Sequence, residues 1–209
     1  MNYQVCEMYE AIQGEGFLSG TPVTLLRLQG CTVGCPWCDT KHSWDAQRGE
    51  PKTPSELVDM WKVIKCASDW LMITGGEPSE QPLRDLVTLF VDFGANIMVE
   101  TSGTGTGLLN CHELIDHVVL SPKAHKLPTL ENLEIADELK LVVRSDADVL
   151  LWNEYLQTQD VSRKRRHGME VSVQPEFGSR PESTKAAVRA AHKYGWRLSF
   201  QMHKLLGLR

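Results

Sequence analysis

The sequence predicts an α/β fold, an open partial barrel of about six core parallel strands. Two observations lead to this prediction. From Trp70 onward, apolar segments with strand character alternate with segments of helical periodicity, which is typical of a parallel sheet. The chain has 209 residues, which is short of the roughly 250 residues of a complete eight-fold α/β barrel. We therefore expect an incomplete barrel, in a single domain spanning residues 1–209.

The N-terminal part of the chain contributes the first strands. Residues 3–12 have extended character, and the glycines on both sides of Glu15 free the backbone that follows. Residues 21–28 form a near-continuous apolar strand interrupted by Arg27. Alternation places Arg27 on the face of apolar neighbours two and four residues earlier, so its guanidinium either pairs with a buried carboxylate or points into a cavity that holds an anion.

Helix signals follow. Thr53 offers an N-cap, Pro54 a first-turn proline and Glu56 the partner of a capping box, so we expect a helix from here to about Cys66. Its apolar residues recur at helical spacing, which indicates core packing. We expect further strands at residues 70–74, 96–101, 117–120, 138–143, 170–174 and 196–201, and helices at about 82–93, 108–115, 147–157 and 182–194.

Three cysteines, Cys31, Cys35 and Cys38, lie in one loop at a C-x3-C-x2-C spacing. Thiolates are soft ligands, which restricts the metal to zinc, copper(I) or iron in an iron–sulfur cluster. His42 would complete a closed Cys3His zinc site. An iron–sulfur cubane held by three thiolates would instead leave one iron open to an outside ligand. The spacing alone leaves both readings open.

Polar motifs follow the predicted strands at their carboxyl ends. They comprise the cysteine loop and residues 75–78, 102–104, 121–123, 174–176 and 201–204. In α/β barrels the active site lies at the carboxyl ends of the strands. We therefore expect all of these residues to lie together at that end of the barrel.

Composition excludes several classes of protein. Hydrophobic content of 42% and charged content of 23% are ordinary for a globular protein. No apolar run is long enough to cross a bilayer, and the N-terminal residues lack the pattern of a secretory leader, so we expect a cytoplasmic protein without membrane contact. A net charge of −5 argues against direct binding of nucleic acid. We interpret the basic run at residues 163–167 as a solvated loop, and Cys6, Cys66 and Cys111 as buried small hydrophobes.

The cysteine loop, with Trp37 immediately before its last cysteine, resembles the signature of radical S-adenosylmethionine (SAM) enzymes. Further segments resemble motifs of the 7-carboxy-7-deazaguanine synthase family. They are residues 10–16, 27–30, 38–41, 74–78, 100–104, 121–123 and 201–204. The resemblance extends over nearly the whole chain and implies a partial barrel of the radical SAM type.

This resemblance also implies a set of site residues. Cys31, Cys35 and Cys38 would hold a 4Fe–4S cluster whose fourth iron binds SAM, and Thr40 would help to bind Mg2+. The residues implied to bind SAM are Trp37, Cys38, Asp39, Gly76, Glu77, Ser102, Ser121, Pro122 and Lys123. The residues implied to bind the substrate, 6-carboxy-tetrahydropterin, are Ile12, Gln13, Gly14, Glu15, Arg27, Thr74, Gln174 and His203.

The implied activity is that of a radical SAM lyase. A flavodoxin or ferredoxin would reduce the cluster, SAM would be cleaved, and the pterin would lose a hydrogen atom, contract its ring and release ammonia. The product, 7-carboxy-7-deazaguanine, is a precursor of queuosine-type tRNA bases, and the resemblance also implies a homodimer. Two alternatives remain: a zinc-stabilised binding module that uses the three cysteines and His42, and a radical SAM activase of a partner protein.

Overall fold

The computed structural model describes residues 1–65, 67–160 and 168–208. Within these ranges nine strands form one sheet in the order β3-β1-β2-β4-β5-β6-β7-β8-β9. The strands are β1 (Tyr3–Ile12), β2 (Pro22–Leu28), β3 (Glu50–Lys52), β4 (Trp70–Gly75), β5 (Asn96–Thr101), β6 (His117–Leu120), β7 (Glu138–Val143), β8 (Glu170–Pro175) and β9 (Arg197–Leu198). β1 pairs antiparallel with β2 and β3, and all pairs from β2 to β9 are parallel.

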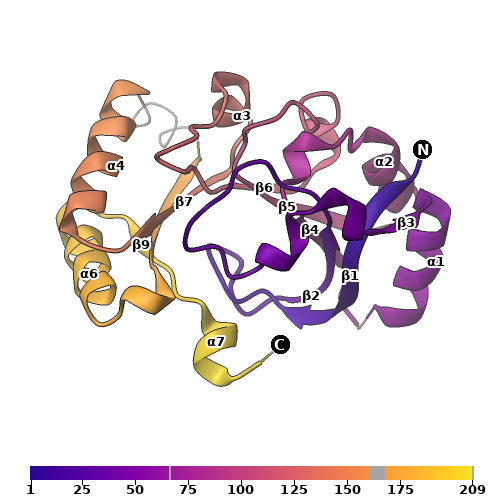
Figure 1. Ribbon diagram of the computed structural model, residues 1–209, viewed down its shortest axis with the longest axis horizontal. Coiled ribbons are helices and arrows are strands. Elements are labelled where there is room, and N and C mark those ends of the chain that lie inside the picture. Colours follow the sequence, from indigo (N-terminus) through magenta and orange to yellow (C-terminus); the bar gives the residue numbers. More distant parts are fainter. Residues whose placement is uncertain (66, 161–167, 209) are drawn as a thin grey trace.

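Four helices, α1, α2, α4 and α6, lie around the outside of the curved sheet, and the loop after β2 lies within its concave side (Figure 1). The α-helices are α1 (Pro54–Ile64), α2 (Arg84–Asp92), α3 (Leu130–Glu134), α4 (Asp146–Thr158), α6 (Glu182–Tyr194) and α7 (Met202–Leu206). Short 3-10 turns are η1 (Lys41–Ser43), η2 (Ala46–Arg48), η3 (Pro78–Glu80), η4 (His112–Leu114) and η5 (Phe177–Ser179). Within the described ranges, no helix combines the length and apolar character that a bilayer crossing needs.

The core lies mainly between the sheet and the outer helices. Helix α1 begins with the predicted capping box of Thr53 and Glu56, and it buries Trp61 against Phe90 of α2 with their rings edge to face. A second cluster packs α4 and α6 against β7 and β8. On the concave side, a smaller cluster built around Leu25 and Met72 forms an apolar floor.

Strand and helix order confirm the predicted fold class. Strands β2, β4, β5, β6, β7 and β8 supply the six core parallel strands, and β9 adds a short seventh. The sheet ends on β3 at one edge and β9 at the other, so the barrel stays open.

Two predicted elements differ from the structure. The helix predicted at residues 108–115 is wrong, because this segment contains only the turn η4; Leu108 and Cys111 are fully buried along an irregular path, and no side chain caps the turn. The strand predicted at residues 196–201 is paired only over β9, after which the chain leaves the sheet towards the concave side.

Three short elements were not predicted, and some of the predicted residues lie outside the described ranges. Strand β3 and helices α3 and α7 were missed because each is five residues or shorter and carries little periodicity. Cys111 is buried as expected, whereas Cys6 is only partly buried. Cys66 and the basic run at residues 163–167 lie outside the described residues.

Candidate active site

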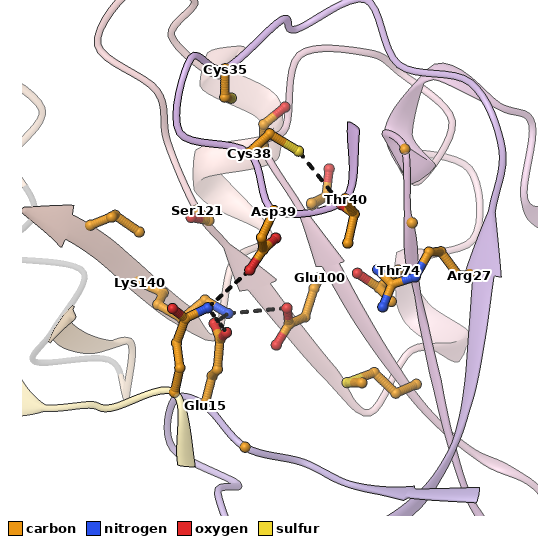
Figure 2. Close-up of a pocket in the computed structure, with 18 of the residues that line it drawn as sticks. Glu15, Arg27, Cys35, Cys38, Asp39, Thr40, Thr74, Glu100, Ser121 and Lys140 are labelled. Carbon is orange, nitrogen blue, oxygen red and sulfur yellow. Dashed lines mark hydrogen bonds and ion pairs between the residues drawn. The ribbon is translucent and has the colours of Figure 1, made fainter. Parts of the chain in front are cut away.

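A cavity of about 430 Å³ opens at the carboxyl ends of the parallel strands. Figure 2 shows side chains from the cysteine loop, from the glycine turn after β1 and from strands β2, β4, β5 and β7 pointing into it. Every residue that the sequence assigned to cluster, SAM, substrate or magnesium lines this cavity, with one exception. The exception is Pro122, which is buried beside it.

The cysteine loop is closed at its base by backbone hydrogen bonds. Gly30 N donates to Ser43 O at 2.8 Å, and Cys31 N donates to Trp44 O at 3.0 Å. Within the loop, Cys38 N donates to Cys35 O at 3.1 Å. All three cysteines are free thiols that face the cavity. The loop therefore presents three soft ligands from a closed and hydrogen-bonded turn.

The spacing of these thiols fits a cluster better than a single zinc ion. In tetrahedral zinc sites, Zn–S bonds of about 2.3 Å place the sulfur atoms roughly 3.8 Å apart. Among the described residues, the group of potential ligands that lie within 4.8 Å of one another consists of Cys6, Glu7 and His42 and includes no cysteine of the loop. A cubane is wider and spreads its thiolates further apart. His42 therefore does not lie with the loop cysteines, as the alternative of a Cys3His zinc site would require.

The glycine turn after β4 lies directly against the start of the cysteine loop. Gly76 N donates to Leu28 O at 2.9 Å, and Glu77 N donates to Gly30 O at 2.8 Å. A Cβ atom at Gly76 would lie 2.0 Å from Gly30 O, so only glycine permits this approach.

The Glu77 carboxylate is buried and fully engaged. It accepts hydrogen bonds from Ser79 N at 2.9 Å and from Ser102 N at 2.7 Å, and also from the hydroxyl groups of Ser79, Thr101 and Ser102. Glu77 thus joins the ends of β4 and β5. The backbone of Gly75 and Gly76 lines the cavity beside it.

Lys123 brings a positive charge beside the cysteines. Its Nζ donates to Ser121 O and to Ser121 Oγ, both at 2.7 Å. Burial lowers the pKa of Lys123, and the nearby Cys35 opposes that shift. Conversely, burial raises the pKa of the Cys35 thiol while Lys123 lowers it. A cation at this point is suited to an anionic cluster or to a carboxylate of a ligand.

On the opposite wall, Arg27 has the predicted carboxylate partner and also lines the cavity. Its Nε donates to Glu7 Oε1 at 2.7 Å, and its guanidinium lines the cavity with only 14% of the side chain exposed. Burial lowers the pKa of Arg27, but the hydrogen bond and the charge of Glu7, together with Tyr9, outweigh this and keep the pKa raised. A paired, oriented guanidinium at a cavity wall is suited to a carboxylate ligand.

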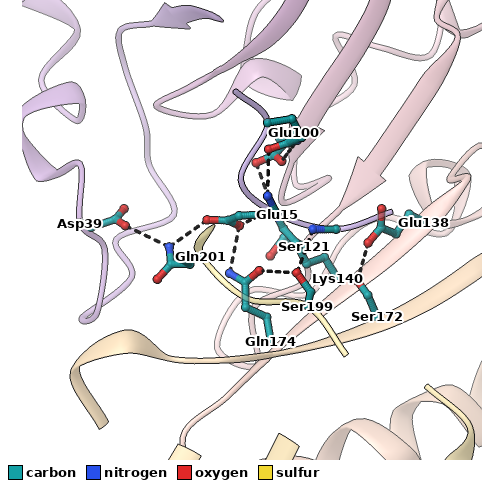
Figure 3. Close-up of polar contacts among 12 residues, drawn as sticks. Glu15, Asp39, Glu100, Ser121, Glu138, Lys140, Ser172, Gln174, Ser199 and Gln201 are labelled. Carbon is teal, nitrogen blue, oxygen red and sulfur yellow. Dashed lines mark hydrogen bonds and ion pairs between the residues drawn. The ribbon is translucent and has the colours of Figure 1, made fainter. Parts of the chain in front are cut away.

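Lys140 forms a buried charge network with Glu15 and Glu100 (Figure 3). Its Nζ lies 2.6 Å from Glu15 Oε2 and 3.0 Å from Glu100 Oε2, and 4% of its side chain is exposed. Burial would lower the pKa of Lys140, yet Glu100 and Glu15 raise it overall. Gln13 Nε2 donates to Glu100 Oε1 at 2.8 Å. A charge this deep requires such partners.

Glu15 is held ionised by the same network. Burial alone would raise its pKa, but the charge of Lys140 and hydrogen bonds from Lys140, Gln174 and Gln201 bring it to about 2. Gln174 Nε2 and Gln201 Nε2 donate to its two oxygens at 2.9 and 2.8 Å. Glu15 is therefore a carboxylate acceptor at any physiological pH.

Hydrogen bonds from its backbone to side chains of the C-terminal half of the chain hold the turn that carries Glu15. Phe17 N donates to Glu138 Oε2 at 2.8 Å, and Gly16 N donates to Ser199 Oγ at 2.8 Å. Gly16 adopts φ 68°, which favours glycine. At Gly14 a Cβ atom would lie 2.3 Å from the ring of His203, so glycine is what lets this histidine reach the cavity.

Thr40 and Asp39 lie where the cysteine loop meets the substrate side of the cavity. Thr40 Oγ1 is 3.5 Å from Cys38 Sγ. Asp39 is hydrogen-bonded by Lys204 and, at 3.4 Å, by Gln201. Both side chains point into the cavity (Figure 2).

Sequence reasoning missed Lys140, and it gave no role to Glu100, which belonged to a recognised motif. A signal was present, because each is a charged residue within a strand that is mostly apolar, and such residues are almost never buried without partners. Gln201 and Lys204, which hold Glu15 and Asp39, belonged to a recognised motif but had been given no role.

The family model for the 4Fe-4S single cluster domain matches residues 12–120. This range contains the cysteine loop, the glycine turn after β4 and the polar end of β5. Together with the open parallel sheet and the three free thiols at its mouth, the match makes the protein an iron–sulfur enzyme of the radical SAM class.

Comparison with known proteins identifies the family. The chain is 34% identical to 7-carboxy-7-deazaguanine synthase of Synechocystis sp., covering 100% of this chain and 95% of that one. It is 30% identical to the Escherichia coli (strain K12) protein of the same name, with both chains fully covered. The crystal structure of QueE from Escherichia coli matches with a TM-score of 0.82 and 28% identity, over 97% of this chain and 95% of that one. The chain belongs to the 7-carboxy-7-deazaguanine synthase family and is a radical SAM lyase.

Proposed function

We propose that the protein converts 6-carboxy-5,6,7,8-tetrahydropterin to 7-carboxy-7-deazaguanine with release of ammonia, a step in the synthesis of queuosine-type 7-deazapurines. The observation that supports this most strongly is the composition of one cavity. Cys31, Cys35 and Cys38 line one side of it, and Arg27 and Glu15 line the other. An activase of a partner protein would have no use for these two substrate-side residues.

In this proposal the substrate carboxylate binds to Arg27, whose orientation is set by Glu7. Gln13 and the peptide groups of Ile12 and Gly14 contact the edge of the pterin ring, which offers alternating donors and acceptors. Further contacts come from Glu15, Thr74, Gln174 and His203. Because Lys140 keeps Glu15 ionised, Glu15 can accept hydrogen bonds from the N–H groups of the ring.

The cluster and SAM, when bound, supply the one-electron chemistry that removes a hydrogen atom from the pterin. Cys31, Cys35 and Cys38 would hold the cluster. The residues proposed to bind SAM are Trp37, Cys38, Asp39, Gly76, Glu77, Ser102, Ser121, Pro122 and Lys123. In this proposal the Lys123 ammonium pairs with the carboxylate of SAM, and the backbone of Gly76 contacts the amino group of SAM. The apolar floor formed by Leu25 and Met72 keeps water away from the reacting ring.

We further propose that Mg2+ binds beside the substrate through Thr40. One protein hydroxyl can suffice, because Mg2+ keeps several waters and takes ligands from substrate oxygens. Turnover titrated with Mg2+ should show a weaker response in Thr40→Val than in Thr40→Ser. An equal response in the two variants would exclude this role.

The remaining expectations concern partners. We propose a flavodoxin or ferredoxin as reductant, a homodimer, a cytoplasmic location, and one functional domain over residues 1–209. Sedimentation velocity of the cluster-loaded protein tests the dimer, and turnover driven by a reduced flavodoxin in place of dithionite tests the reductant.

The direct test of the activity is anaerobic turnover. Cluster-loaded protein, SAM, dithionite and 6-carboxy-tetrahydropterin should yield 7-carboxy-7-deazaguanine by mass spectrometry. The matched control is Cys35→Ala, which should yield none. Cleavage of SAM by the wild-type protein without any loss of the pterin would overturn the proposed substrate.

A further inference from the structure

Strand β1 carries a β-bulge near its start. Its register with β2 pairs Val5 with Leu28 and then Glu7 with Arg27, so the alignment shifts at Cys6. In a regular strand, Cys6 and Glu7 would point to opposite faces. A bulge re-aims side chains locally. Here it accompanies an arrangement in which the ligand atoms of Cys6 and Glu7 lie within 4.8 Å of each other.

His42 completes this group from a different element. A nitrogen of its ring lies within the same 4.8 Å of the Cys6 sulfur and a Glu7 oxygen. The backbone of η1 that carries His42 is held in place, because Gln29 Nε2 donates to His42 O at 2.8 Å. Gln29 N in turn donates to Gln4 O of β1 at 2.8 Å. These hydrogen bonds tie η1 to β1 and so help to hold His42 beside Cys6 and Glu7.

We propose that Cys6, Glu7 and His42 form a binding site for a divalent ion of the zinc type. Thiolate, carboxylate and imidazole are the three donor classes that zinc takes from proteins, and sites with three protein ligands leave the fourth position to water. Cys6 and Glu7 are partly buried and His42 is exposed, so the site has a solvent-facing side for that water.

This site is separate from the cluster site. Cys31, Cys35 and Cys38 line the cavity, whereas Cys6, Glu7 and His42 do not. The link between the two is Glu7, whose Oε1 accepts from Arg27 Nε at 2.7 Å. A bound ion would share this carboxylate with Arg27 and would tie β1 to the segment that leaves the cysteine loop. The guanidinium remains compensated as long as one Glu7 oxygen stays with it.

The test uses the cluster-loaded protein under anaerobic conditions. Zinc sulfate is titrated against a chromophoric chelator, and the desalted protein is analysed for zinc and iron by mass spectrometry. The variants are Cys6→Ala and His42→Ala. The control is His112→Ala, since His112 is another exposed histidine and lies in η4. Zinc X-ray absorption then reports the donor atoms.

We expect the wild-type protein and His112→Ala to bind about one zinc without loss of cluster iron, and each site variant to bind it at least about tenfold more weakly. The absorption spectrum should show one sulfur at about 2.3 Å and lighter donors at about 2.0–2.2 Å. Zinc binding that is unchanged in both site variants, that is absent in the wild-type protein, or that displaces cluster iron would overturn the proposal.

Discussion

The Nε atom of Arg27 lies 2.7 Å from Oε1 of Glu7, and the two residues are register partners on the antiparallel strands β2 and β1. The guanidinium is thereby oriented by a neighbouring strand while it faces the cavity. In the proposed function, a substrate carboxylate recognises the two-pronged geometry of this guanidinium and not merely its charge.

Arg27→Lys should therefore keep the positive charge but weaken binding of the pterin by about ten- to a hundredfold, because charge-assisted hydrogen bonds of this kind contribute roughly 1.5–3 kcal/mol. Isothermal titration with 6-carboxy-tetrahydropterin measures the loss. Iron content and SAM cleavage without substrate should be unaffected. In the control variant Arg48→Lys, a change at an exposed arginine, pterin binding, iron content and SAM cleavage should all be unaffected. If Arg27→Lys instead binds the pterin normally and loses its cluster, Arg27 is a structural ion-pair partner.

Cys35→Ala should leave the protein folded but without an intact cluster or SAM cleavage. Removing one of three thiolates affects the cofactor far more than a core built on a nine-stranded sheet. Circular dichroism and iron content of the variant are compared with those of the wild-type protein and of Cys111→Ala, which alters a buried thiol outside the cavity. Retention of both iron and activity by Cys35→Ala is the outcome that contradicts the ligand assignment.

Gly76→Ala should weaken SAM binding and iron retention. The added Cβ would meet the backbone oxygen of Gly30, and the resulting shift would separate the glycine turn from the cysteine loop. The matched control is Gly94→Ala, where φ is 85° and the added Cβ meets nothing within 4 Å. That variant should suffer only the strain of the left-handed conformation, about 1–2 kcal/mol of stability. Equal SAM affinity in the two variants would show that the close contact is unimportant.

The pKa of Glu15, lowered from 4.5 to about 2, predicts a pH dependence of stability. Because the folded state favours the ionised carboxylate, Glu15 stabilises the protein fully above about pH 4.5, and this contribution falls as the pH approaches 2. Glu15→Gln imitates the protonated form. The wild-type protein should exceed it in free energy of unfolding by roughly 2–3 kcal/mol at pH 7, and the difference should shrink on acidification. A difference that is constant from pH 7 to pH 3.5 in urea titrations would contradict this assignment.

The sequence was sufficient to predict the parallel strands and the rim at their carboxyl ends, because these depend on local apolar runs and on motifs that follow each strand. It was also sufficient for Arg27, since a cation within an apolar strand needs either a partner or a ligand. Helix α1 was predicted from its capping box, its first-turn proline and the helical spacing of its apolar residues. Local signals of this kind do not depend on how distant segments meet.

The charge network around Lys140 could not be predicted in the same way. Glu15 and Lys140 are 125 residues apart in sequence, and nothing local specifies that they pair. The spatial neighbours of His42, which was considered as a fourth ligand only in the alternative zinc reading, could not be predicted for a related reason. Its sequence neighbours are the cysteines of the loop, whereas its spatial neighbours depend on a bulge in β1.

The central claim is that one cavity holds both the SAM-derived radical chemistry and the pterin. The most direct measurement is anaerobic turnover of 6-carboxy-tetrahydropterin deuterated at its ring carbons, with mass analysis of the 5′-deoxyadenosine formed. Direct hydrogen transfer within the cavity predicts that deuterium enters 5′-deoxyadenosine as 7-carboxy-7-deazaguanine accumulates. Unlabelled 5′-deoxyadenosine together with unchanged pterin would contradict the account.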